Sequence, residues 1–106
     1  MLTINLGFVQ YRDFGNAHIC LAPLANFTNI TAFVHNGYAT SLDVSHLQNA
    51  ANLIFIEISR CTYSIYNLEH LAALPDLLML GLPWHLMIDV AESGIFGDNV
   101  LVTGGG

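Results

Sequence analysis

Residues 71–85 read LAALPDLLMLGLPWH, and this stretch decides the fold. Its leucines recur at every third residue and then once after two, at Leu71, Leu74, Leu77, Leu80 and Leu82. A spacing of three suits neither an α-helix, whose apolar face recurs at three and four residues, nor a strand, which alternates. The closing alternation is typical of a short strand. The stretch therefore predicts a turn-rich segment that leads into a strand.

The same pattern occurs twice more, upstream of residue 71. One copy has its apolar residues at Leu24, Phe27, Ile30 and Phe33, and the next has them at Leu47, Ala50, Leu53, Ile56, Ile58 and Cys61. The copies begin at Leu24, Leu47 and Leu71, so their starts are almost evenly spaced along the chain. A unit this short cannot bury its apolar side alone, so such units stack on one another. The repeat predicts a stack in which Ile56 lies beside Leu80.

The three copies resemble the LxxLxxLxxLxLxxN/C unit of leucine-rich repeats, and they read LANFTNITAFVHNGY, LQNAANLIFIEISRC and LAALPDLLMLGLPWH. The connecting pieces resemble the Asp-Ile-Ser-Pro-Leu joint of the internalin-like, 22-residue class, at Ala22-Pro23-Leu24, Asp43-Val44-Ser45-His46-Leu47 and Asp89-Val90. This resemblance implies an α/β leucine-rich-repeat solenoid of about four to five coils. Its concave face would carry a short parallel β-sheet, and its convex face turns or short helices.

We expect one leucine-rich-repeat domain over residues 1–106, with clear repeats in 21–90 and partial coils in 1–20 and 91–106. A half-copy at the start would place its apolar residues inward at Met1, Ile4, Leu6 and Val9, and the last coil would do so at Val100 and Val102. Three features depart from the family. The repeats are slightly longer than those of the internalin-like class, His35 replaces an inward leucine, and only Cys61 fits the position normally held by asparagine or cysteine.

Composition bounds the function. Hydrophobic residues make up 54% of the 106 residues and charged residues only 9%, which is typical of an ordered chain with one core. A net charge of −6 disfavours nucleic acid as a partner. The apolar run 77–88 contains Pro83 and is shorter than the roughly twenty residues of a membrane span. No secretory signal is evident at the start, so the compartment stays open between the cytoplasm and, for an excised domain, the cell surface.

The register of the repeats gives the residues that face outward on the sheet. Those that we select as partner-binding are Phe8, Val34, Asn36, Phe55, Glu57, Arg60, Met79 and Trp84. Large apolar side chains and arginine on one exposed face are the composition of interface hot spots. The sequence therefore predicts a module that binds a protein or peptide. Two alternatives stay open: a register shifted by one would bury these residues, and uncapped end coils would make the chain a self-associating homo-oligomer.

Catalytic chemistry has little support in the sequence, so we expect neither an enzyme nor catalytic residues, metal or cofactor. There is no GxSxG, HExxH or phosphate-binding loop motif. His46 and His70 occupy equivalent positions, but zinc needs three or four ligands. The recurrent aspartates Asp13, Asp43 and Asp89 suit turns, where a carboxylate accepts backbone N–H groups.

Overall fold

The computed structural model describes residues 2–59 and 61–104, and for residue 2 and residues 13–17 it describes the backbone alone. The strands are β1 (Leu2–Asn5), β2 (Phe8–Cys20), β3 (Ala32–Asp43), β4 (Phe55–Ile58), β5 (Thr62–Tyr66), β6 (Met79–Leu82) and β7 (Leu101–Gly104). The helices are the 3₁₀ turns η1 (Ala22–Leu24), η2 (Ser45–Leu47) and η3 (Leu68–Ala73) and the α-helix α1 (Trp84–Ser93).

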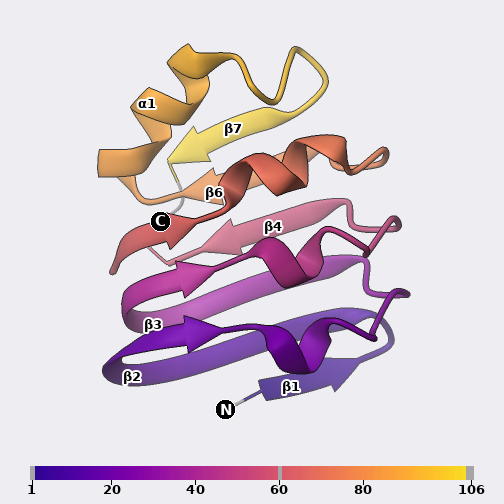
Figure 1. The fold of residues 1–106 in the computed structure, drawn as a ribbon, viewed down its shortest axis with the longest axis vertical. Coiled ribbons are helices and arrows are strands. Elements are labelled where there is room, and N and C mark those ends of the chain that lie inside the picture. The colour runs from indigo at the N-terminus through magenta and orange to yellow at the C-terminus, as the bar shows by residue number, and fades with distance from the viewer. Residues whose placement is uncertain (1, 60, 105–106) are drawn as a thin grey trace.

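The strands form one mixed, mostly parallel sheet in the order β1-β2-β3-β4-β6-β7, with β5 paired to β3. Only β1 is antiparallel to its neighbour in the described part of the chain. The long strands β2 and β3 bend round one end of the molecule, so each of them runs along two sides of it (Figure 1). Their pairing is interrupted by register shifts between Asp13 and His18. The fold is thus α/β, with few helices and a largely parallel sheet.

The pairing register follows the sequence repeat. Phe33 pairs with Ile56 and Ile56 pairs with Leu80, so each residue lies beside the one at the same position of the next copy, and the predicted neighbourhood of Ile56 and Leu80 is confirmed. The same row continues to Val9 on β2 and to Val102 on β7. Val9, Phe33, Ile56 and Leu80 are fully buried, and Val102 is packed against them. This inward row is the centre of the core.

The spacing of three comes from consecutive turns closed by hydrogen bonds between residues three apart. The N–H of Ala50 donates to the C=O of Leu47, and the N–H of Leu53 donates to the C=O of Ala50, both at 3.0 Å. A chain that bonds in this way makes one turn every three residues, so every third side chain tends to point the same way. Leu47, Ala50 and Leu53 are accordingly buried, as is Leu71 in η3. Phe27 of the first copy is an exception, because it is 48% exposed beside Ile4 of the β1–β2 hairpin.

The start of the chain differs from the expected half-coil. Ile4 and Leu6 were expected inward, but they are 41% and 98% exposed. Ile4 lies on the antiparallel strand β1, and Leu6 and Gly7 form the turn of the β1–β2 hairpin. Both have positive φ, 50° and 88°, and two such residues in succession form the turn that suits the twist of a two-residue hairpin. The strand that pairs in the repeat register is therefore β2, and its Val9 is the residue equivalent to Phe33 and Ile56.

The second difference is α1, which occupies a segment that was expected to continue as strand and joint. Pro83 precedes the helix, and its C=O accepts the N–H groups of Leu86 at 3.0 Å and Met87 at 2.9 Å. Proline lacks an N–H for the sheet ladder, but it suits the start of a helix. Gly94 ends the helix at φ 70°. Trp84, Asp89 and Val90 therefore lie in α1, so the placement of Trp84 on a strand and of Asp89-Val90 in a joint was wrong.

Candidate functional site

One outward row of the parallel sheet is apolar across five neighbouring strands. We call it the apolar row, and its members pair in the order Phe8, Ala32, Phe55, Met79 and Leu101. Each member directly precedes a residue of the buried inward row, so the alternation of strand side chains turns it to the opposite face. The sheet thus carries an apolar layer on each side, and only one of them is the core.

The apolar row is partly open to solvent. Phe8 is 44% exposed and Leu101 57%, whereas Phe55 and Met79 are half-buried. Ile54 and Leu78 come immediately before β4 and β6, and they are 44% and 60% exposed. They extend the apolar surface toward the start of the strands. Exposed apolar side chains gathered in this way are typical of interaction sites.

The next outward row is polar at its ends and centre. It consists of Gln10, Val34, Glu57, Gly81 and Thr103. Glu57 is half-buried and carries the row's ionisable side chain. Val34 was expected to be exposed, but it is only 8% exposed. It pairs with Gln10 on β2 and with Glu57 on β4.

The predicted site residues are thus only partly brought together. Phe8, Phe55 and Met79 lie in the apolar row, with Glu57 one outward position farther along β4. Asn36 is half-buried and pairs with Arg12 at the far end of the same face. Phe8 joins the row in a different register from the predicted one, because β2 starts at Phe8.

Two members of the predicted set stand apart. Trp84 is 61% exposed at the first residue of α1, and an added Cβ at Gly104 would lie only 2.6 Å from its ring. Trp84 therefore covers the end of β7 instead of extending the row on β6. Arg60 lies outside the described residues.

The sequence reasoning missed three exposed members of this surface, Ile54, Leu78 and Leu101. Leu101 had a usable signal, because Val100 and Val102 were expected inward and the residue between them therefore faces outward. Ile54 and Leu78 had none, because a spacing of three accounts for Leu53 and Leu77 and leaves the following residue unconstrained.

Acidic residues are exposed in the turns that lead into β6 and β7. Asp76 and Asp98 are exposed and each lies three residues before the first residue of a strand, Met79 and Leu101, which pair with each other. The turns between are in register as well, since the N–H of Leu101 donates to the C=O of Leu78 at 2.8 Å. Glu57 therefore lies beside the apolar row on its own face, and Asp76 and Asp98 are exposed in the two neighbouring turns that lead into it.

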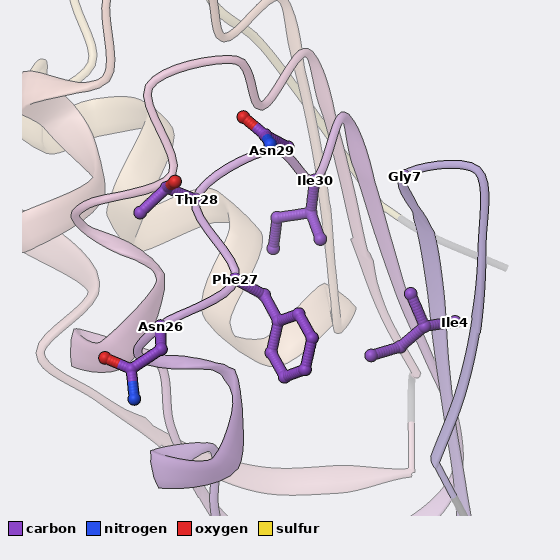
Figure 2. A pocket seen from close by; sticks show the side chains of 7 residues that line it. All are labelled: Ile4, Gly7, Asn26, Phe27, Thr28, Asn29 and Ile30. Atoms are coloured by element: carbon purple, nitrogen blue, oxygen red, sulfur yellow. The ribbon is translucent and has the colours of Figure 1, made fainter.

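A small pocket lies beside the N-terminal end of the sheet. It has a volume of about 190 Å³ and is lined by Ile4, Gly7, Asn26, Phe27, Thr28, Asn29 and Ile30. Phe27 and Ile30 face Ile4 across it, whereas the side-chain amides of Asn26 and Asn29 point away (Figure 2). The pocket is therefore an apolar notch between the β1–β2 hairpin and the turn before β3, with room for little more than one side chain.

Polar contacts connect the turns on the other side of the molecule. Asp43 Oδ1 accepts hydrogen bonds from Asn67 Nδ2 and from the N–H of Ser45, both at 2.9 Å. These bonds, that from Asn67 first, hold the pKa of Asp43 below its usual range. The turn role expected for Asp43 is thus confirmed, whereas the side chain of Asp13 lies outside the described residues.

Histidine and cysteine side chains also occur on this side. Cys20 Sγ lies 3.9 Å from His46 Nδ1, and both cysteines are free. Among residues 2–59 and 61–104 no three His, Cys, Asp or Glu side chains are grouped so that they could hold a metal ion. His35 is buried and its Nδ1 lies 3.2 Å from Thr62 Oγ1, so its inward position is confirmed.

The chain has no match among family models, and comparisons with curated proteins and with solved structures also give no match. In the part of the chain that the structure describes, no helix has the length and apolar character needed to cross a membrane.

Proposed function

We propose that this chain is a recognition module of the leucine-rich-repeat kind, and that its apolar row binds a protein or peptide. The assignment to leucine-rich repeats is supported by strands that pair in the register of the sequence repeat and by the short turns between the paired strands. Parallel strands fed by tight turns are what such repeats require.

The observation that carries the binding proposal is the apolar row itself. Five apolar residues in succession on an outward face contribute nothing to the core beneath, and two of them, Phe8 and Leu101, are open to solvent by 44% and 57%. Exposure of this surface to water is unfavourable, at about 25 cal/mol per Å² of apolar area. A partner that covers it gains that free energy on binding.

The test is a selection of binders from a random peptide library displayed on phage, with the wild-type chain as bait. Selected peptides should lose binding to Phe55→Glu and to Leu78→Glu, which place a charge in the row and beside it. They should keep binding to Tyr63→Glu, a matched control at an aromatic residue that is 75% exposed on β5, outside the row. Peptides whose binding is insensitive to both row variants would contradict the proposal.

Self-association is the second candidate, and the sheet edges favour it. β1 and β7 are the outermost strands in the pairing order. An edge strand has unpaired N–H and C=O groups that can bond to a strand of another copy. Sedimentation equilibrium over a wide range of protein concentration tests this candidate, and a constant monomer mass would exclude it.

A further inference from the structure

The apolar row has a defined length and pitch. It crosses five adjacent strands, from Phe8 on β2 to Leu101 on β7. Adjacent strands lie about 4.8 Å apart, so four spacings make the row about 19 Å long. A partner segment that follows the row must present apolar side chains at nearly this pitch.

An α-helix meets this requirement better than an extended peptide does. One helical turn advances about 5.4 Å, so apolar residues spaced by three or four recur within about 0.6 Å of the strand spacing. In an extended peptide, side chains on one face recur about every 6.6 Å, and the mismatch is about 1.8 Å per step. A row of about 19 Å corresponds to about thirteen helical residues.

The charges around the row determine which kind of helix fits. Glu57 lies one outward position beyond the row on β4, Asp76 and Asp98 lie in the turns just before β6 and β7, and Arg12 lies farther away on the same face, two outward positions beyond the row on β2. The whole chain has eight acidic residues against two arginines and no lysine, for a net charge of −6. Like charges across an interface are costly and opposite charges favour association. If a second copy of this chain bound the row through the same face, the three carboxylates of one copy would lie near those of the other. Their repulsion disfavours self-association through this face.

We propose that the partner on the apolar row is a cationic amphipathic helix of about thirteen residues. One side of this helix carries a single apolar stripe, and lysine or arginine lies on both sides of the stripe. This inference rests on the proposed binding function. The apolar stripe covers Phe8, Phe55, Met79 and Leu101, and the basic residues lie near these three carboxylates.

The test uses three synthetic 14-residue peptides with the same number of leucines. The first has leucines at helical spacing with lysine at the sides, the second replaces each lysine by glutamate, and the third has the composition of the first with alternating leucines. Binding is measured by fluorescence anisotropy of labelled peptide at two salt concentrations. Baits are the wild-type chain, Leu78→Glu, and the triple variant Glu57→Gln, Asp76→Asn, Asp98→Asn.

We expect the first peptide to bind the wild type at least tenfold more tightly than the other two peptides. Leu78→Glu should weaken it at least tenfold, even though Leu78 is 60% exposed and its replacement leaves the core intact. The triple variant should weaken it and reduce its salt dependence.

Equal affinity for the glutamate peptide would overturn the charge requirement, and equal affinity for the alternating peptide would overturn the helix. Absence of binding by all three overturns the inference as well. The phage selection separates these failures from failure of the proposed function, because peptides of another type that depend on the row would still be selected.

Discussion

Two leucines only two residues apart provide the sharpest test of the fold. Leu80 on β6 is fully buried between Ile56 and Val102 in the inward row, whereas Leu78, just before β6, is 60% exposed. Strict alternation from Leu80 would turn Leu78 inward as well. The turn with a spacing of three instead turns Leu77 inward, with 3% exposure, and leaves Leu78 in solvent.

Leu80→Ala should therefore lower the free energy of unfolding by about 2 to 5 kcal/mol, because the fully enclosed site cannot collapse around the missing methyl groups. That is a large fraction of the roughly 5 to 15 kcal/mol of a whole domain. Leu78→Ala removes the same atoms from a mostly exposed site and should cost less than about 1 kcal/mol.

The assay is urea unfolding of both variants beside the wild type. The transition is followed by circular dichroism and by the fluorescence of Trp84, the chain's single tryptophan. The sensitive quantity is the difference between the two variants, since they share the same chemical change. Equal costs, or a larger cost for Leu78→Ala, would refute the register of β6 and with it the outward direction of the apolar row.

Three further predictions concern the turns and the end of the sheet. Since the pKa of Asp43 is lowered from 3.8, its carboxylate stabilises the fold above pH 3.8, and this contribution is lost as the pH falls through the native pKa. In Asp43→Asn, the urea midpoint should therefore fall less steeply as the pH is lowered. An acid dependence equal to that of the wild type would contradict the assignment. Asn67→Ala should cost about 1 to 2 kcal/mol in urea unfolding because Asn67 has φ 64° and donates to Asp43, whereas Asn67→Gly, which relieves the backbone, should cost less. Gly104→Ala should displace the ring of Trp84, whose Cε2 would lie 2.6 Å from the new Cβ, and so shift tryptophan emission to the red; an unshifted spectrum would show that the ring does not lie there.

The part of the core that the three copies supply could be predicted from sequence because one physical rule governs it, whereas Ile19 on β2 and Leu42 on β3, which are also buried in the core, lie outside that rule. Hydrogen bonds between residues three apart bring Leu47, Ala50 and Leu53 to the same side, and the same spacing is visible in the leucines from Leu71 to Leu80. The register between strands then follows from the repeat length, because a slip of one residue would move a whole buried row to the solvent face. Phe55 beside Met79 was predictable for that reason.

The two ends of the sheet were not predictable by the same rule. The β1–β2 hairpin depends on Leu6 at φ 50°, a backbone conformation that a leucine rarely adopts, so Gly7 at φ 88° is the one turn residue whose preference points to it. The helix α1 had signals, with Pro83 before it and Gly94 after it, which are typical helix boundaries. They were outweighed by the resemblance of Asp89-Val90 to a repeat joint. Pro83 and Gly94 determine the structure of this segment, whereas the partial resemblance to a repeat joint does not.

The residue directly before a strand is exposed in three successive turns, at Thr31, Ile54 and Leu78. Leu78 donates its N–H to the C=O of Ile54, and Ile54 donates to the C=O of Thr31, so these three residues are equivalent in successive turns. All three are exposed, and the first of them, Thr31, is polar. An apolar side chain is thus not needed at this position before β3, whereas Val100, directly before β7, packs against the core. Isoleucine and leucine occur there only beside Phe55 and Met79, at the centre of the apolar row. The partner that we propose for the apolar row would cover these two exposed apolar side chains, and the Leu78→Glu variant tests that proposal.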